Sequence, residues 1–519
     1  MPAVVTDQFR IANAGNFVDS VLDSNNSYYV FLGLPNPAVA GFGRTTSWPS
    51  NPVDNQQYLT HYRDTSLFGK KINSSNIRRV VKKHSWAANT KYDIYRHDYS
   101  EEANKAPNSQ TGSLYKTNYY VITSEFKVYI CLSNGGTGDT PKGVDSLDEP
   151  TFTDLEPSTA GTQDPYVWKY LFTVSPSDVV KFDSTEYIVL PNDWSTTTDS
   201  QIQSIREAGD SDINKNQIRK VYIETGGTGY TDQSTVCNIL GDGSGAKALV
   251  TVTGGVITDV IVTAGGSGYT FGMVDLIDLG TPSTRAKLIP IIPPSKGHGF
   301  DIYTELGADK VLVYSRFDDS TKDFPTDTHF GQVGIIKNPK NFTNSGILTT
   351  SQFSSSFSIK LNDAIDASTD FNALIGIGIT QSVTGGIAKG IVSSYDKDTK
   401  VLKYIQDRSS YLNPTSFDNT DFTNITTRSK VLSFENTDGS GDKIFGQGGA
   451  VSFDSTIENF SGITTIIGSK QTNLGVQFTN GLANPEINKK TGDVIYIDNR
   501  TKVERNIRQK EDVKIILEF

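Results

Sequence analysis

Cysteine is scarce in this sequence: only Cys131 and Cys237 occur among 519 residues. Two thiols so far apart are too few for a disulfide framework or a zinc module, so we expect ordinary reduced thiols in a protein made in a cytoplasm. No apolar run approaches the ~18–20 residues of a membrane-spanning helix. The start, MPAVVTDQFR, lacks the cationic residues and apolar run of a signal peptide. We therefore expect no membrane association.

Positive charge is in deficit, with 48 Lys and Arg against 58 Asp and Glu and a net charge of −10. Binding nucleic acid through the overall field of a protein requires clustered positive charge, so this balance argues against a nucleic-acid partner. One basic cluster is present. We interpret it as a solvated helix face, with an acidic or phosphate-bearing partner as the alternative. Its members are Arg78, Arg79, Lys82, Lys83 and His84.

Residue patterns of catalysis are also missing. None of the five histidines forms the i,i+4 pair of a zinc protease, and no Gly-x-Ser-x-Gly nucleophile elbow occurs. His298 lies between two glycines, and we interpret it as a turn residue rather than a base. Paired carboxylates for sugar cleavage occur by chance among 58 acidic residues and carry no signal by themselves. We expect no enzyme activity and no catalytic residue.

Two glycine-rich segments resemble ligand-binding loops only superficially. A phosphate-binding loop requires Gly-x4-Gly-Lys-Ser/Thr between a strand and a helix, whereas in GDGSGAK (241–247) an alanine separates the glycine from the lysine. GGTGYTD (226–232) looks like a calcium-binding repeat, but such repeats work as tandem coils that share carboxylates. We interpret both segments as turns, and we expect no cofactor, no metal and no small-molecule ligand.

Glycine and tyrosine, by contrast, are abundant, with 46 and 23 residues, and serine, threonine and asparagine are plentiful. This composition favours short strands joined by polar turns over helices, which need Ala, Leu, Glu and Lys. We predict a mainly β fold: a layered β-sandwich-like core with long loops and few short helices, plus inserted small β domains. The chain is long enough for about two to four domains.

Residues 164–191 carry the strongest strand signal. Alternate residues of a strand point to the same face, so four alternating aromatic side chains are expected to line one face. These are Tyr166, Trp168, Tyr170 and Phe172. A turn at 175–178 ends this strand, and a second strand runs through 186–190 before a proline. We predict that the pair lies in the middle of a core.

Helical signals are few, and residues 1–52 are predicted as strands and turns. Within 54–84, apolar residues have helical spacing twice, which predicts two helices. The two groups are Tyr58, Leu59 and Tyr62, and then Ile77, Val80 and Val81. A further helix is predicted after Thr198 as its cap, ending at Gly209.

Residues 218–294 contain an internal repeat. The tyrosines of its two Gly-Gly-x-Gly-Tyr runs, Tyr230 and Tyr269, are 39 residues apart, and each copy later returns to a strand. A repeat of this period is a supersecondary unit that buries its apolar face against its copy, and the glycines supply a tight turn. We predict a small duplicated β module inserted into the core.

The last residues, 513–519, alternate between apolar and mostly charged side chains, which predicts a strand half-buried on the core. Together these patterns predict five parts of the chain. They are the N-terminal part of the core with loop regions (1–217), the Gly-rich duplicated module (218–294), the continued core (295–340), a second inserted β domain (341–485) and the C-terminal core strands (486–519).

Four separated segments resemble one protein family, in the same order along the chain. The strongest is Asp164–Phe172 followed by Glu186–Pro191, an aromatic strand and then Glu-Tyr-Ile-Val-x-Pro. The others are TGDVIYIDNR (491–500) with VKIILEF (513–519), VTDQFR (5–10) with FGR and TSWPSN (42–51), and FGQVGIIKNP (330–339). On these segments the chain resembles the dimeric, β-rich baseplate wedge subunit of T-even-like contractile-tailed bacteriophages. The resemblance covers about half of the chain.

The resemblance implies a structural subunit of the virion tail baseplate, assembled in the host cytoplasm. It implies a homodimer that holds other wedge proteins and relays conformational change toward sheath contraction. The alternatives are a receptor- or glycan-binding tail adhesin and a polysaccharide depolymerase. The residues expected in the core or in assembly contacts are Tyr166, Trp168, Tyr170, Phe172, Tyr187, Ile495, Tyr496, Ile515 and Leu517.

Overall fold

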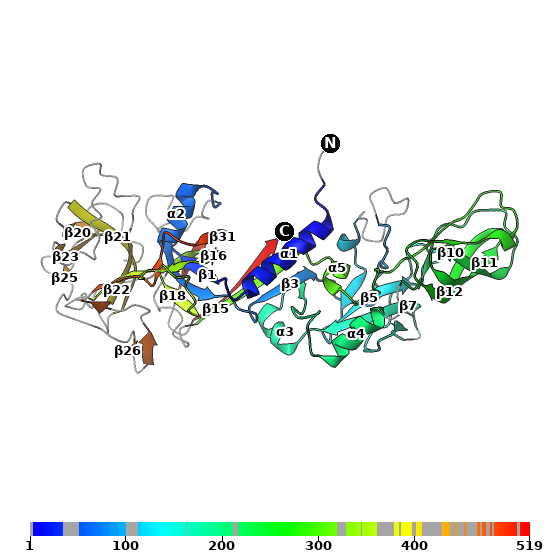
Figure 1. Ribbon diagram of the computed structural model, residues 1–519, viewed down its shortest axis with the longest axis horizontal. Helices are drawn as coiled ribbons and strands as arrows, with labels where there is room; N and C mark the ends of the chain where they lie inside the picture. The colour runs from blue at the N-terminus through cyan, green and yellow to red at the C-terminus, as the bar shows by residue number, and fades with distance from the viewer. Residues whose placement is uncertain are drawn as a thin grey trace. The chain divides into compact units, whose positions relative to one another are not determined.

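The computed structural model describes most of the chain (Figure 1). The described residues are 4–34, 51–99, 113–161, 163–210, 216–318, 329–343, 345–360, 482–505 and 509–519, together with nine strand segments between 378 and 479. Residues 42–50 of the family resemblance and much of the predicted domain 341–485 lie outside them.

Strands dominate the described residues, which also hold five α-helices. This confirms the predicted mainly β class with few short helices. The chain divides into two compact units: unit 1 comprises Met1–Val18, Arg78–Leu312 and Ile515–Phe519, and unit 2 comprises Asp19–Ile77 and Val313–Lys514. The five predicted parts and their boundaries remain a prediction.

The N-terminal region differs from the prediction of strands and turns, because it contains the longest described helix, α1 (Asp7–Leu22). The buried positions of α1 recur every three or four residues, which is the helical period. They are Ile11, Ala14, Val18 and Val21. The polar and small residues between them weaken the apolar pattern, so the sequence does not reveal this helix.

Side-chain caps mark the starts of the four other described helices, and Asp301 caps the last of them. Asn55, Ser175 and Asp199 each accept a hydrogen bond from a backbone N–H of the first turn, at 2.9, 3.2 and 2.9 Å. The cap of the predicted helix is therefore Asp199 rather than Thr198, and the predicted turn at 175–178 is a helix start. The helices are α2 (Gln56–Thr65), α3 (Pro176–Phe182), α4 (Ser200–Asp210) and α5 (Ile302–Leu306).

The second helix predicted within 54–84 is instead a strand, β3 (Ile77–Lys82). Three of its six residues are β-branched and fit a strand better than a helix. β3 pairs with β8 (Tyr187–Val189), with Val80 opposite Val189. This long-range pairing outweighs the local helical spacing.

The predicted aromatic strand is β7, which lies inside an antiparallel sheet of unit 1 with the order β4-β5-β7-β6. Trp168 of β7 faces Cys131 of β5, and Phe172 faces Val128. Most residues of β7 are buried on both of its faces, so the strand runs through the core as predicted. The strands are β4 (Tyr120–Ile122), β5 (Lys127–Asn134), β6 (Ser158–Thr159) and β7 (Tyr166–Thr173).

A second four-stranded sheet has the order β32-β15-β3-β8 and contains the C-terminal strand. In β32, Ile515 is buried while its neighbours Lys514 and Ile516 are exposed, which is the predicted half-buried alternation. The two further strands of this sheet are β15 (Lys310–Asp318) and β32 (Lys510–Glu518).

Unit 2 contains a five-stranded sheet of order β18-β2-β1-β16-β31, in which β1 is buried at all six positions. A cluster that includes Tyr29, Phe31 and Phe353 packs on this sheet. The strands are β1 (Tyr28–Gly33), β2 (Ser66–Lys71), β16 (His329–Lys337), β18 (Gln352–Ser354) and β31 (Asp493–Glu504).

Unit 2 also contains a nine-stranded sheet and two short two-stranded ones. The large sheet consists of β19 (Phe357–Lys360), β20 (Gly378–Val383), β21 (Gly386–Asp396), β22 (Val401–Gln406), β23 (Arg428–Glu435), β24 (Asp442–Lys443), β25 (Val451–Ser452), β28 (Phe478–Thr479) and β29 (Leu482–Ala483). The pairs are β17 (Lys340–Asn341) with β30 (Ile487–Asn488), and β26 (Thr464–Ile467) with β27 (Lys470–Asn473).

The repeat region forms a sheet of order β12-β11-β10-β13 and a pair β14-β9 (green in Figure 1). The buried residues of its hydrophobic core all lie between Ile218 and Ile292. Its elements are β9 (Val221–Thr225), β10 (Ser234–Gly241), β11 (Ser244–Thr253), β12 (Val256–Ser267), β13 (Gly272–Val274), the 3-10 turn η2 (Ile277–Leu279) and β14 (Lys287–Pro290). We call residues 218–292 the module.

The two copies of the repeat exchange contacts inside the module. The Tyr230 hydroxyl of the first copy accepts a hydrogen bond from Ala286 N of the second, at 2.9 Å. The Tyr269 hydroxyl of the second copy accepts one from Ala246 N of the first, at 3.2 Å. Each tyrosine is buried, so both hydroxyls need such a partner. The copies therefore complete each other and form one core.

Two glycines allow this close approach. Gly227 and Gly266 have φ angles of 65° and 63°, which side chains rarely adopt. A Cβ atom on Gly227 would lie 2.6 Å from Ala286 N, and one on Gly266 would lie 2.5 Å from Ala246 N. The Gly-Gly-x-Gly-Tyr run is thus needed for contact between the copies as well as for a turn.

The two ends of the module lie side by side, because Ile291 N donates a hydrogen bond to Lys220 O at 2.8 Å. The module also contacts the rest of unit 1. The Arg96 guanidinium lies 4.0 Å from the Tyr222 ring centroid, and Ile292 N donates to His97 Nδ1 at 3.2 Å. These contacts hold one end of the module on the segment that precedes β4.

Replacing residues 221–290 by a short Gly/Ser linker should leave the rest of unit 1 folded. The module buries its apolar residues within itself, and its neighbouring ends can be joined without moving the core. Trp168 and Trp194 are both buried outside the module, so their fluorescence reports on the remaining core. We expect a soluble protein with an unchanged tryptophan emission maximum and a cooperative unfolding transition.

The matched control is residues 216–293 expressed alone, which should fold into a β-rich fragment by circular dichroism. Aggregation of the shortened chain, together with an unfolded fragment, would show that the module and the core depend on each other.

Candidate functional site

The aromatic face of β7 is the first feature of interest in unit 1. Tyr166, Trp168, Tyr170 and Phe172 are each at most 2% exposed. The Tyr166 and Trp168 rings stack with centroids 5.4 Å apart, and Tyr92 meets Trp168 edge-on at 5.6 Å. Aromatic pairs of this kind contribute ~0.5–1.5 kcal/mol beyond the burial of their area. The face is a close-packed core element and has no surface left for a ligand.

Several polar groups around this face are bonded to one another, although Trp168 Nε1 has no hydrogen-bond partner among the described residues. The Tyr166 hydroxyl donates to Val144 O at 2.8 Å and accepts from Tyr92 N at 3.0 Å. The Asp164 carboxylate accepts from the N–H groups of Asp148, at 3.1 Å, and Tyr166, at 3.2 Å. Because buried polar groups without partners are costly, these bonds hold the loops on either side of the sheet in one arrangement.

The remaining predicted residues do not gather at one place. Ile515 is 4% exposed in β32, and the side chains of three others are partly buried. Those three are Tyr187, Tyr496 and Leu517.

Ile495 is 44% exposed, which contradicts its predicted place in the core. The reason is a bulge in the pairing of β31 with β16. Tyr496 faces Ile335 and Val494 faces the next residue, Ile336, so Ile495 has no partner in the ladder. A simple alternation along the sequence cannot reveal such an insertion.

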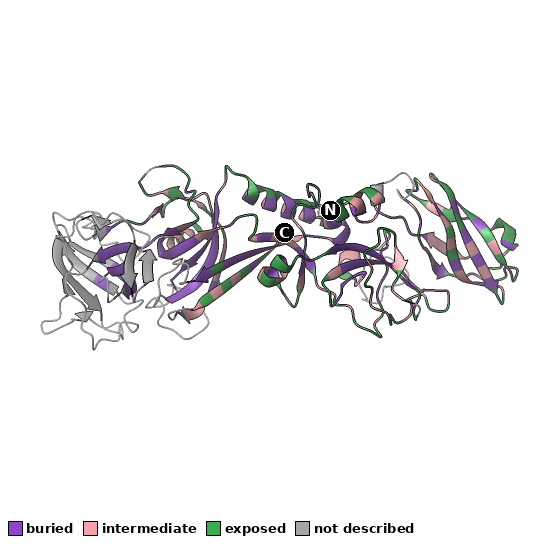
Figure 2. Cartoon of the chain, turned by 90° about the horizontal axis from the view of Figure 1, so that it is seen from below, coloured by how far each residue is buried: buried purple, intermediate pink, exposed green. Residues whose placement is uncertain are grey.

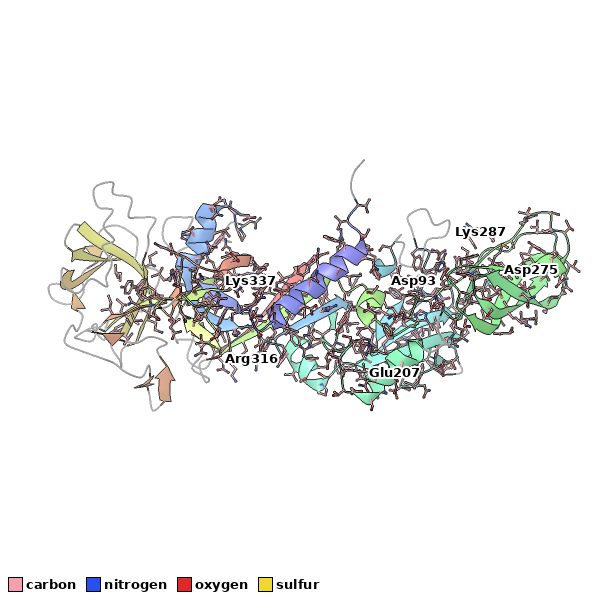
Figure 3. All side chains as sticks on the ribbon, in the orientation of Figure 1. Asp93, Glu207, Asp275, Lys287, Arg316 and Lys337 are labelled. Carbon is pink, nitrogen blue, oxygen red and sulfur yellow. The ribbon has the colours of Figure 1, made fainter. Side chains whose placement is uncertain are left out.

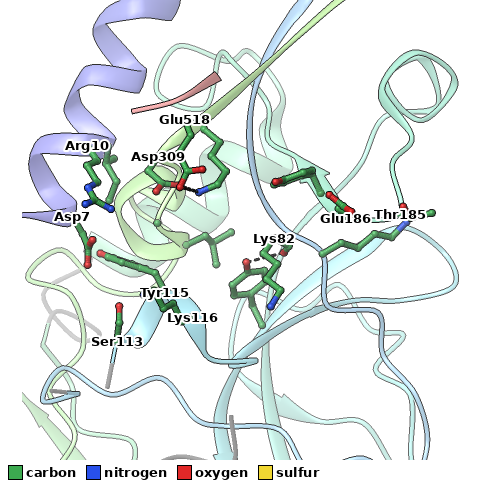
Figure 4. Close-up of a pocket in the computed structure, with 17 residues that line it drawn as sticks. Asp7, Arg10, Lys82, Ser113, Tyr115, Lys116, Thr185, Glu186, Asp309 and Glu518 are labelled. Carbon is green, nitrogen blue, oxygen red and sulfur yellow. Dashed lines mark hydrogen bonds and ion pairs between the residues drawn. The ribbon is translucent and has the colours of Figure 1, made fainter. Parts of the chain in front are cut away.

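The second feature is an open cleft of about 620 Å³ in unit 1 (Figure 4). Its walls come from the start of α1, the end of β3, the region around the 3-10 turn η1 (Leu114–Lys116), the start of β8, the loop after α5 and the end of β32. Of the residues expected in the core or in assembly contacts, Tyr187 alone lines it, and Lys82 and Lys83 of the basic cluster line it too. Most of the others escaped prediction because the lining residues come from six segments that lie far apart in the sequence.

Charges of both signs line the cleft. Lys310 Nζ lies 2.9 Å from an Asp309 oxygen and 3.2 Å from a Glu518 oxygen. Burial by itself would lower the pKa of Lys310, but hydrogen bonds to these carboxylates raise it above the ordinary value. Three other cations that line the cleft have no side-chain partner among the described residues: Arg10, Lys82 and Lys116.

The basic cluster predicted for a helix face is divided, because β3 sends alternate side chains to opposite faces. Arg78 forms two hydrogen bonds to the Asp178 carboxylate, at 2.8 and 3.2 Å. Arg79 instead lies over the Tyr303 ring, 3.8 Å from its centroid. Of the cluster, the two lysines line the cleft. The five residues therefore do not form one anion-binding patch.

His84, the last member of the cluster, packs edge-on against Tyr120 with ring centroids 5.1 Å apart. Burial, with a smaller effect of the Lys82 charge, lowers the pKa of His84 to about 4. The imidazole is therefore neutral near pH 7 and adds no positive charge to the cleft.

His298 lies in a turn, as predicted, and outside the cleft. Its Nδ1 is 2.5 Å from Glu305 Oε1, and Gly299 N donates to Glu305 Oε2 at 2.8 Å. The Tyr95 ring meets the imidazole edge-on at 4.8 Å. These contacts fix the turn on α5 and leave the imidazole little exposed.

The two glycine-rich loops are turns whose carboxylates bind backbone N–H groups. Asp232 accepts from Gly254 N at 3.0 Å and Gly255 N at 2.6 Å, and Asp242 accepts from Thr270 N at 2.9 Å. Among the described residues, no group of three or more His, Cys, Asp or Glu is placed to hold a metal ion. Cys131 and Cys237 are free and buried, and no described helix could cross a membrane.

A family model described as Bacteriophage T4, Gp8 matches residues 117–204. The match spans β4, β5, β7, α3 and β8, and so includes the aromatic face and part of one wall of the cleft. It supports a structural role in a phage baseplate wedge, a location in the virion tail baseplate and association with other baseplate proteins. This family is structural, which argues against an enzyme. The comparison with curated proteins found no match.

The buried imidazole of His84 should make the stability of unit 1 depend on pH. Its folded-state pKa of about 4 lies below the ordinary 6.5, so between these values the unfolded chain binds more protons. The free energy of unfolding must then fall as the pH falls through this interval, by up to ~3 kcal/mol from this group. We expect urea unfolding, followed by tryptophan fluorescence, to show this loss.

The His84→Gln variant lacks this titration, so its unfolding free energy should fall less steeply over the same interval. Carboxylates contribute equally to the pH dependence of both proteins. The difference between the two slopes of unfolding free energy against pH therefore measures the contribution of His84. Parallel curves for the two proteins would show that His84 titrates normally in the folded state.

Proposed function

We propose that this chain works as a homodimeric structural subunit of the baseplate wedge. In this role it holds neighbouring wedge proteins in register and passes conformational change toward the contracting sheath. The observation that carries the proposal is the match of residues 117–204, which falls on the segment that contains the buried aromatic face. A subunit that transmits motion must move as a body, and a close-packed core resists deformation.

Contacts from the matched segment into the rest of unit 1 support this role. Trp194 packs against Phe172 with centroids 5.9 Å apart. Its Nε1 donates to the carbonyl groups of Gly299, at 3.2 Å, and Phe300, at 3.1 Å. The turn that carries His298 is thereby fixed to the aromatic sheet. Both packing and hydrogen bonds thus join residues 117–204 to the turn that precedes α5.

The cleft is the surface through which we expect a neighbouring wedge protein to bind. Its cations without partners can bind carboxylates, while Glu186 and Asp7 on the same walls can bind amines. Charges of both signs on the walls suit a protein segment that carries charges of both signs.

Reversing two charges in the cleft should reduce incorporation of the subunit into baseplates. The Lys82→Glu, Lys116→Glu double variant replaces two exposed cations and should leave the core intact. Like charges across an interface cost several kcal/mol, so we expect at least a ~tenfold drop in the amount found in purified particles. Quantitative mass spectrometry of particles from a complemented amber mutant measures it.

Lys91→Glu is the matched control, because Lys91 is exposed outside the cleft and its replacement changes the net charge in the same direction. Normal incorporation of both variants would exclude the cleft as a wedge contact. Absence of the unmodified protein from purified baseplates would exclude the proposed function itself.

A further inference from the structure

The sheet β12-β11-β10-β13 of the module has one face on the module core and the other in solvent. Figure 2 shows buried and exposed residues alternating along these strands. On the solvent side, called here the outer face, six large apolar side chains are between 48% and 78% exposed. They are Val236, Leu240, Ile261, Phe271, Met273 and Ile277.

Single exposed apolar residues are common, but four of these lie close together in the sheet. Leu240 faces Met273 across β10 and β13, and Val236 and Ile261 face the same residue of β11, Leu249. At half to three-quarters exposure, six such side chains offer roughly 500 Å² of apolar surface, near the upper limit for soluble monomers. A standard interface buries about 800 Å² per partner, so this patch could form the centre of one.

The charges of the outer face lie between its apolar parts. Lys247 of β11 faces Asn238 of β10, and Asp275 N on the other side donates to Asn238 O at 2.9 Å. A lysine and an aspartate (labelled Asp275 in Figure 3) thus stand in one row on either side of β10. The Leu240–Met273 pair lies on one side of this row, and Val236 lies on the other.

We propose that two copies of this chain meet through their outer faces. The two-fold axis that relates them lies between the two sheets, over β10 and parallel to the strands. Rotation about this axis exchanges the two sides of β10. Lys247 then lies opposite the partner's Asp275, and Leu240 lies opposite the partner's Leu240. Met273 lies over the partner's Gly245, which has no side chain and where an added Cβ atom would meet only Gly266 Cα, at 3.7 Å. The inference rests on the proposed homodimer and assigns its interface.

The charge pattern is what identifies a second copy as the occupant. The row formed by Lys247, Asn238 and Asp275 carries one sign on each side of β10, so the row complements itself under this rotation. A nucleic acid would require net positive charge, which this row does not have. The apolar pairs above and below the row would be excluded from water at the same time, as in the core of a stable interface.

Sedimentation velocity of the full chain at micromolar concentration tests the proposal. Unmodified protein should be a dimer. The Leu240→Lys, Met273→Lys double variant should raise the dimer Kd at least ~100-fold, because charges would replace the apolar centre. Val180→Lys is the matched control: Val180 is 77% exposed on α3, away from the module, and its replacement should leave the Kd unchanged.

Charge reversal tests the two-fold arrangement itself. Lys247→Asp places two aspartates opposite each other and Asp275→Lys places two lysines opposite each other, so each variant should raise the Kd at least ~tenfold. The combined variant restores opposite charges and should return the Kd to nearly the original value. Such rescue cannot come from a folding defect.

A monomeric unmodified protein would overturn the proposal. A dimer whose Kd none of these variants changes would also overturn it, while leaving a homodimer with another interface. A different result, the absence of the protein from purified baseplates, would contradict the proposed wedge function. The two failures are therefore distinguishable.

Discussion

The stacked rings of Tyr166 and Trp168 are the contact on which most of unit 1 depends. Because these rings are fully buried, the Tyr166 hydroxyl must be bonded inside the protein, and it bonds Val144 and Tyr92. The segment that carries Tyr92 continues to Arg96 and His97, which contact the module. A continuous series of packed and hydrogen-bonded groups therefore joins the aromatic sheet to the module.

The cleft and the outer face of the module differ in chemistry, and the difference suits different kinds of contact. The cleft combines carboxylates with cations that have no side-chain partner among the described residues, and charged contacts mainly determine which partner binds and how fast it binds. The outer face is largely apolar, and apolar burial stabilises long-lived association. A wedge subunit that stays paired while its neighbours rearrange would need both.

The module also shows how a duplicated sequence becomes a single structure. Each tyrosine binds the backbone of the opposite copy, and Gly227 and Gly266 leave room for it. Neither copy could satisfy these hydroxyls by itself. The repeat thus behaves as one cooperative unit with neighbouring ends, a form that can be inserted into a core without separating the strands on either side.

Sequence patterns by themselves determined the features that depend on neighbouring residues: the mainly β class, the buried aromatic strand β7, the repeat and the alternation of β32. Tertiary structure decided the features that depend on distant partners. Val80 became part of a strand because Val189 pairs with it, and Ile495 is exposed because β16 leaves it in a bulge. Packing of the two repeat copies against each other was expected, but the cleft and the tyrosine hydrogen bonds between the copies could not be predicted, because contacts between distant residues create them and no local periodicity records such contacts.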